Sequence, residues 1–61
     1  MGQKELQNLI ESVLFKQNHY KKLAKETTNE VYKKSYTEKI EFYHKIFVSL
    51  AKELDKLSKN N

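Results

Sequence analysis

The sequence predicts an all-α protein: an antiparallel hairpin of two helices that dimerises into a four-helix bundle. The 61-residue chain has no proline, and its single glycine is Gly2, so no residue inside the chain is a strong helix breaker. Apolar residues recur every three or four positions along two long segments, as they do on one face of a helix. A chain this short buries only about 60% of its unfolded surface, and without cysteine it has no disulfide to compensate. Association with another chain is the remaining way to stabilise it.

The first helix is predicted at about residues 4–25. One face carries its apolar residues, which are Leu6, Leu9, Ile10, Val13, Tyr20, Leu23 and Ala24. Neither this segment nor any other reaches the roughly 18 consecutive apolar residues of a membrane span. The N-terminal residues also lack the apolar core of a signal peptide. We therefore expect a cytoplasmic protein with no membrane partner.

The turn is predicted at about residues 26–29, where Thr and Asn side chains compete with helical hydrogen bonding. Thr27 and Glu30 have the spacing of a capping box, and Thr28 is an alternative N-cap one residue later. A single unbroken helix that forms a coiled coil is the alternative architecture. The apolar heptad pattern shifts by two residues across this window, which favours the hairpin.

The second helix is predicted at about residues 30–58. Its apolar stripe consists of Tyr32, Tyr36, Ile40, Tyr43, Ile46, Phe47, Leu50, Leu54 and Leu57. A turn centred near Thr28 would set Val13 near Tyr43 and Leu9 near Phe47 across the hairpin.

Near the open end, both helices carry apolar residues on more faces than one neighbouring helix can cover. A second hairpin would complete a four-helix bundle and cover them. We expect Phe15, Phe42 and Val48 at this new interface; the alternative is that they are scattered exposed apolar residues. The predicted partner or dimer interface comprises Leu9, Val13, Leu14, Phe15, Phe42, Tyr43, Ile46, Phe47, Val48 and Leu50.

Charge is concentrated around the turn. All twelve basic residues are lysines, against eight acidic residues, and residues 16–39 hold seven of the lysines and three glutamates. The whole net charge of +4 therefore lies at this end. It would attract an acidic protein surface or nucleic acid phosphate, although without arginine base recognition would be weak and salt-dependent. The predicted basic tip comprises Lys21, Lys22, Lys25, Lys33 and Lys34.

Motifs for catalysis are missing from the sequence. The chain has no cysteine, no Gly-x-Ser-x-Gly elbow and no glycine-rich phosphate loop, so we predict no enzyme and no cofactor. Glu41 and His44 have the Glu-x-x-His spacing of di-iron four-helix bundles, with Glu11 on the other helix as a further candidate ligand. All three lie off the apolar stripes, so solvated charges are the favoured interpretation and no metal site is predicted.

The segment 51–57 resembles, at Glu53, Leu54 and Asp55, the Ser-Gln-Glu-Leu-Asp signature of small Bacillus sporulation phosphatases, which are also helical hairpins. Ala51 and Lys52 replace the serine and glutamine of that signature, and the family's glycine-containing loop is missing. The sequence is therefore not assigned to that family.

The favoured function is a small regulatory or adaptor protein that binds itself, a protein partner, or both. The alternatives are non-specific nucleic-acid binding through the basic tip and inhibitor- or antitoxin-like binding to one protein target. A composition rich in lysine, asparagine, tyrosine and isoleucine is typical of AT-rich genomes and favours a bacterial or phage source.

Overall fold

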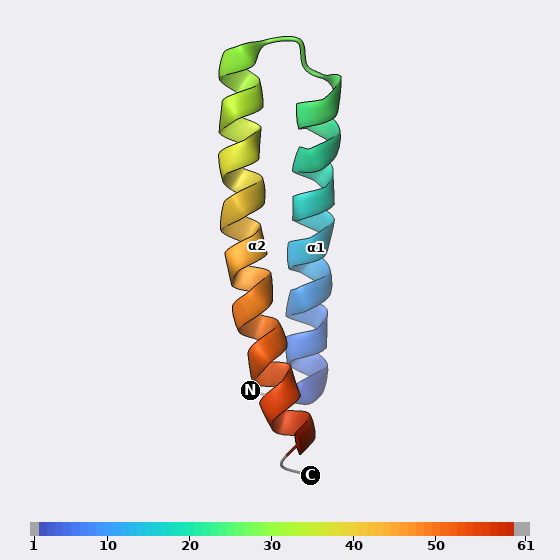
Figure 1. The fold of residues 1–61 in the computed structure, drawn as a ribbon. Helices are drawn as coiled ribbons and strands as arrows, with labels where there is room; N and C mark the ends of the chain where they lie inside the picture. The colour runs from blue at the N-terminus through green and yellow to red at the C-terminus, as the bar shows by residue number, and fades with distance from the viewer. Residues whose placement is uncertain (1, 60–61) are drawn as a thin grey trace.

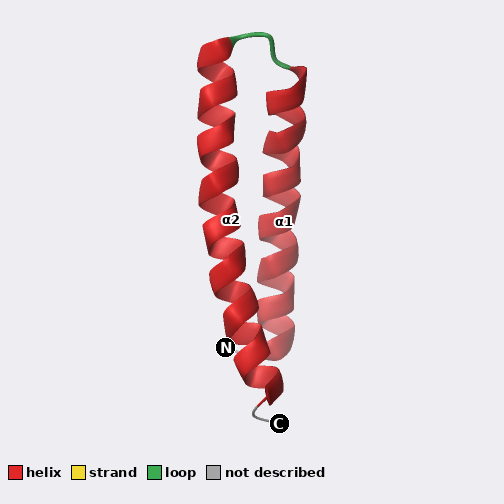
Figure 2. Cartoon of the chain, viewed as in Figure 1, coloured by secondary structure: helices red, strands yellow, loops and turns green. Residues whose placement is uncertain are grey.

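The chain folds as a two-helix hairpin, as predicted. The computed structural model describes residues 2–59, in which α1 (Gln3–Glu26) and α2 (Glu30–Lys59) lie side by side (Figure 1). The described residues contain only these helices, Gly2 and the loop between the helices (Figure 2), and the start of α1 and the end of α2 lie at the end of the hairpin opposite the loop. Each helix bound lies within one residue of the predicted one. We call the loop end the tip and the other end the open end.

The N-cap of α2 is Asn29, and the predicted threonine caps are wrong. The Asn29 side-chain oxygen accepts hydrogen bonds from the amides of Val31 (2.9 Å) and Tyr32 (3.3 Å). These are two of the four amides that a helix start leaves without an intrahelical partner. Thr27 instead ends α1: its backbone is extended, and its amide donates to the Leu23 carbonyl (3.0 Å). Asparagine immediately before the helix is a better N-cap than threonine, which explains the difference.

We expect Asn29→Ala to destabilise the hairpin by about 1 kcal/mol, because two amides of α2 lose their acceptor. In a chain of this length that corresponds to a fall of about 4–8 °C in the thermal midpoint, measured by circular dichroism. Thr28→Ala is the matched control, with an expected change within about 0.5 kcal/mol. A larger loss for Thr28→Ala than for Asn29→Ala would show that the cap is misassigned.

The contacts between the helices are displaced along the hairpin from the predicted register. Tyr43 stacks on Tyr20, with ring centroids 5.9 Å apart, and the Lys16 ammonium lies 6.0 Å from the Tyr43 ring centre. Both contact residues come later in α1 than Val13, which the turn-centred estimate placed opposite Tyr43. Helical side chains lean toward the N-terminus of their own helix. In an antiparallel pair the two sets lean in opposite directions, so the contacts shift along the seam.

Little of the chain is buried. Leu6 (4% exposed) and Gln17 (6% exposed) are the only buried residues among those described, and none of the larger side chains is fully enclosed. Apart from Leu9 and Tyr32, which are exposed, the rest of the two apolar stripes is half-buried, because each helix has one neighbour and its stripe is wider than that contact. The hairpin therefore has an apolar seam rather than an enclosed core.

The overall shape is a rod of 48 × 14 × 14 Å with a radius of gyration of 14.2 Å. A compact domain of 61 residues would have a radius of gyration of about 10–11 Å. The solvent-accessible surface is 5017 Å², whereas a compact protein of 7.3 kDa would expose about 4,200 Å². One hairpin thus leaves roughly 800 Å² more surface in water than a compact chain of the same mass.

Candidate interaction surfaces

The ten predicted interface residues divide into two groups in the structure. Three are exposed: Leu9, Phe15 and Phe42. Phe15 and Phe42 are the most uncovered of these, at 75% and 59% of their full exposure. The other seven are half-buried, namely Val13, Leu14, Tyr43, Ile46, Phe47, Val48 and Leu50.

Contacts connect these exposed residues from the side of the hairpin to the outer face of α1, where Phe15 lies two residues before the buried Gln17. The Phe42 ring meets the Tyr43 ring edge-on at 5.5 Å, and the Lys16 ammonium lies near the other helix's Tyr43 ring. Lys16 also lines a shallow hollow with Ser12 and Phe15. We call the set Leu9, Ser12, Phe15, Lys16 and Phe42 the Leu9–Phe42 surface.

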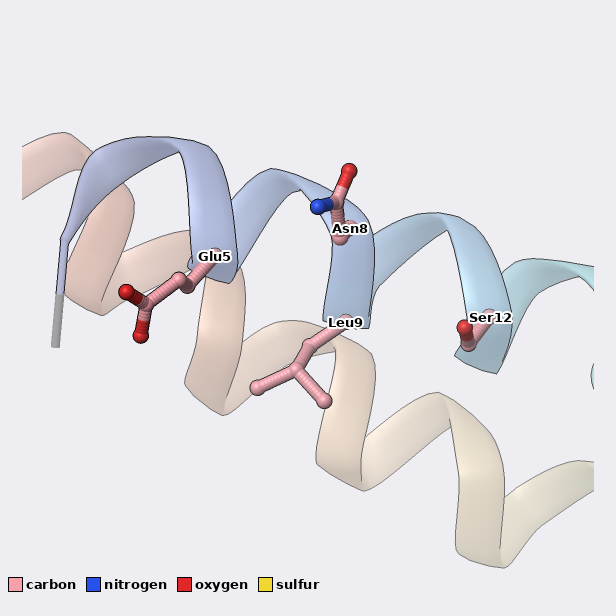
Figure 3. Close-up of a pocket in the computed structure, with 4 residues that line it drawn as sticks. All are labelled: Glu5, Asn8, Leu9 and Ser12. Carbon is pink, nitrogen blue, oxygen red and sulfur yellow. The ribbon is translucent and has the colours of Figure 1, made fainter.

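A neighbouring hollow extends this surface toward the open end. It is lined by Glu5, Asn8, Leu9 and Ser12 of α1 (Figure 3). In Figure 3 the Leu9 side chain points across toward α2, whereas Asn8 points away from it. Leu9 therefore lies beside the seam between the helices, where a second molecule could contact both of them.

Val48 belongs to a different side of α2. At 3.6 residues per turn, Val48 and Phe42 lie about 120° apart around the helix. Val48 is also half-buried, whereas Phe42 is exposed. A second apolar hollow crosses the seam near the open end, lined by Ile10, Phe47, Ala51, Leu54, Asp55 and Ser58. One flat partner surface therefore cannot cover Phe15, Phe42 and Val48 together. An interface that contains Phe42 leaves Val48 out.

The basic tip is exposed to solvent. Each of its five lysines is exposed. The ion pairs found within residues 2–59 are Lys56–Glu53 (3.6 Å) and Lys59–Asp55 (3.0 Å), both near the C-terminal end of α2. Two apolar side chains, Val31 (74% exposed) and Tyr32, are also exposed beside the tip. The tip thus carries lysines that form no ion pair with a neighbouring carboxylate. Beside them lie two exposed apolar side chains.

A ladder of tyrosines joins the helices next to the tip. Tyr20 stacks on Tyr43 (5.9 Å, 13° between ring planes) and lies 6.0 Å from Tyr36. The Lys39 ammonium lies 5.6 Å from the Tyr20 ring centre, a cation–π distance. Aromatic pairs of this kind contribute about 0.5–1.5 kcal/mol beyond their buried area. Three of the four tyrosines therefore act in the seam, and Tyr32 remains largely exposed.

Gln17 is the buried residue that the sequence analysis missed. It lies four residues after Val13 and three before Tyr20, so it occupies an apolar-stripe position with a polar side chain. No hydrogen bond of its side chain is found within residues 2–59, and no side-chain nitrogen or oxygen there is both fully enclosed and unpaired. The Gln17 amide therefore keeps some contact with water at the edge of the seam.

We expect Gln17→Met to stabilise the hairpin by about 1 kcal/mol, because a side chain of similar length removes a poorly paired amide from an apolar contact. Chemical denaturation measures the change. Asn18→Met, on the exposed neighbouring position, is the control and should change stability by less than about 0.5 kcal/mol. Destabilisation by Gln17→Met would mean that the amide makes a hydrogen bond that stabilises the fold.

The candidate metal ligands remain apart from the seam. Glu11, Glu41 and His44 are all exposed, and the His44 ring lies 6.4 Å from the Phe47 ring. In residues 2–59 no group of three or more His, Cys, Asp or Glu side chains is arranged to hold a metal ion. Over the same residues, neither helix has the length and apolarity needed to cross a membrane.

Comparisons of the chain with models of protein families, with curated proteins and with solved structures gave no significant match. The surfaces described above are therefore the basis for a proposal about function.

Proposed function

We propose that this protein is a small non-enzymatic interaction protein that forms a homodimer through the Leu9–Phe42 surface and uses its basic tip to dock on an acidic protein partner. Such a protein acts as a regulator or adaptor. One observation carries the proposal: Leu6 is the only buried apolar side chain among the described residues, while Phe15 and Phe42 remain largely in water.

The size of the uncovered surface supports association. Standard protein–protein interfaces remove about 800 Å² from each partner. The hairpin exposes roughly that much more than a compact chain of its mass. A second hairpin packed on the Leu9–Phe42 surface would cover a surface of this size and provide each helix with a second neighbour.

The tip supports docking on an acidic partner. Its exposed lysines face water without carboxylate partners, so an approaching acidic surface need not displace existing ion pairs. Opposite charges at the edge of an interface chiefly accelerate association and fix orientation. The exposed Val31 and Tyr32 beside them would add apolar contact once the partner is bound.

Sedimentation velocity between about 1 and 100 μM tests the dimer. We expect a species of twice the 7.3 kDa chain mass over most of that range. A folded monomer at every concentration would contradict the proposed dimer. Exchange of the dimer into a complex with one specific target would instead favour the inhibitor- or antitoxin-like function.

Non-specific nucleic-acid binding is a second candidate, favoured by the unpaired lysines of the tip. Tyr20 lies against both Tyr36 and Tyr43 in the seam. Tyr32, whose ring is 6.5 Å from that of Tyr36, is 58% exposed and is therefore the tyrosine most available to stack on a base. Binding of duplex DNA from low to physiological salt discriminates the two functions. The nucleic-acid function is favoured if the affinity for DNA falls steeply as the salt concentration rises. The affinity should also be lower in the double variant Lys33→Gln/Lys34→Gln than in the control Lys45→Gln/Lys52→Gln. If the protein does not bind DNA even at low salt, the nucleic-acid function is excluded.

A further inference from the structure

We infer that the two copies of the proposed dimer pack antiparallel through the Leu9–Phe42 surface, so that the tip of each copy lies beside the open end of the other. This inference rests on the proposed dimer and goes further by fixing the surface and the relative direction of the copies.

The distribution of charge selects the direction. The tip half, residues 16–39, carries seven lysines and three glutamates, whereas the remaining residues carry five lysines and five carboxylates. In a parallel dimer the two +4 halves would lie within roughly a Debye length of each other, about 8–10 Å, where repulsion between charges is only partly screened. In an antiparallel dimer each +4 half lies beside a neutral half that holds Glu5, Glu53 and Asp55.

The position of the exposed aromatic side chains fits the same direction. Phe15 lies close to the middle of α1, and Phe42 lies close to the middle of α2. In an antiparallel dimer the two-fold axis crosses the rods at their middle, where Phe42 of one copy meets Phe42 of the other. When Phe42 packs against Phe42 of the other copy at that axis, the large exposed side chain near the middle of α2 becomes buried in both copies.

Small residues flank this position along α2. Ser35 and Ser49 lie seven residues before and after Phe42, on nearly the same side of the helix. Both are exposed. Because helix separation depends on the side chains at the contact, serines on either side of the crossing let a second α2 approach closely. An antiparallel partner brings Ser35 of one copy opposite Ser49 of the other.

The other apolar strip is a poorer dimer surface. The hollow formed by Ile10, Phe47, Ala51 and Leu54 consists of residues that are already half-buried within one chain. In the open half of the described chain, the large apolar side chains that remain exposed are Leu9, Phe15 and Phe42, all on the Leu9–Phe42 surface. Covering that surface therefore removes the most apolar area from water.

Pulsed electron paramagnetic resonance on a single nitroxide label tests the arrangement, and the chain has no native cysteine to interfere. The label is attached to Thr28→Cys, an exposed loop position. We expect a label–label distance close to the 48 Å length of the rod. A parallel dimer would give less than about 25 Å, the width of two adjacent helices. A label at Lys45→Cys, near the middle of α2, is the control and should give a short distance in either arrangement.

The possible results distinguish the antiparallel arrangement from the proposed dimer on which it rests. A dimer with a short distance at Thr28→Cys overturns the antiparallel arrangement and leaves the dimer intact. A long distance in a dimer that Phe42→Ser does not weaken overturns the assigned surface. A monomer in sedimentation overturns the proposed function itself.

Discussion

Phe42→Ser is expected to raise the dissociation constant of the dimer between about thirtyfold and a thousandfold. A central aromatic residue in an interface contributes about 2 kcal/mol or more, and a tenfold change in affinity corresponds to about 1.4 kcal/mol. The upper value applies if the two symmetry-related copies of the substitution contribute independently. Because Phe42 is 59% exposed within one hairpin, the substitution removes little packing inside the chain, and the helix content should be unchanged at concentrations where the dimer still forms. Sedimentation equilibrium measures the constant, and circular dichroism checks the helix content.

Val31→Ser is the matched control for Phe42→Ser. Val31 is also on α2 and is even more exposed, at 74%, but it lies at the tip rather than at the middle of the rod. We expect less than a threefold change in the dissociation constant, since residues at the rim of an interface contribute little. Equal effects of the two substitutions would contradict a localised interface around Phe42.

Leu6→Ala is expected to remove most of the stability of the chain. Truncating a buried leucine to alanine typically costs about 2–5 kcal/mol. A 61-residue chain has a total stability of about 3–9 kcal/mol at the usual values per residue. Leu6, at 4% exposure, is the one buried apolar side chain among residues 2–59, so its loss is not compensated nearby. Thermal unfolding followed by circular dichroism gives the change.

Leu23→Ala provides the comparison for Leu6→Ala. Leu23 is half-buried near the other end of α1, so less apolar surface is lost on truncation. We expect it to cost less than half as much as Leu6→Ala. If the two substitutions lower the stability equally, the burial of a side chain within one hairpin does not determine how much that side chain contributes to stability.

The helices could be predicted from the sequence because their signal repeats. Two long apolar stripes and a break around Thr27 and Asn29 are enough to predict a hairpin, which the structure confirms. The N-cap was misassigned because Thr27, Thr28 and Asn29 all have side chains that can cap, and only the path of the chain decides which one reaches the amides of α2. The contact register was displaced because the estimate used backbone positions and ignored the lean of the side chains.

The surfaces were predictable only in part. The sequence shows that Phe15 and Phe42 lie off the main stripes, and both are exposed. It did not reveal that Gln17 is buried, because a polar residue in a stripe position reads as a gap in the pattern. The lysine contacts of the tyrosine ladder were missed for another reason: a cation–π contact between helices depends on the register, which the sequence does not determine.

The two proposed binding regions lie at different places on the rod. The Leu9–Phe42 surface extends from near the open end to the middle of the rod, and the basic tip is at the loop end of a molecule 48 Å long. In the antiparallel dimer that we propose, the two tips point in opposite directions. One dimer could then hold two acidic partners at once without loss of its own interface, which is the property that an adaptor requires.

The central claim is that one hairpin cannot shelter its own apolar surface, and urea unfolding at several protein concentrations tests this claim most directly. If folding is coupled to dimerisation, a hundredfold rise in concentration adds about 2.7 kcal/mol to the apparent stability. For a small protein the unfolding midpoint should then rise by about 1–2.5 M urea. A midpoint that stays the same between 1 and 100 μM would contradict the claim, because it would mean that a single hairpin is stable with Phe15 and Phe42 in water.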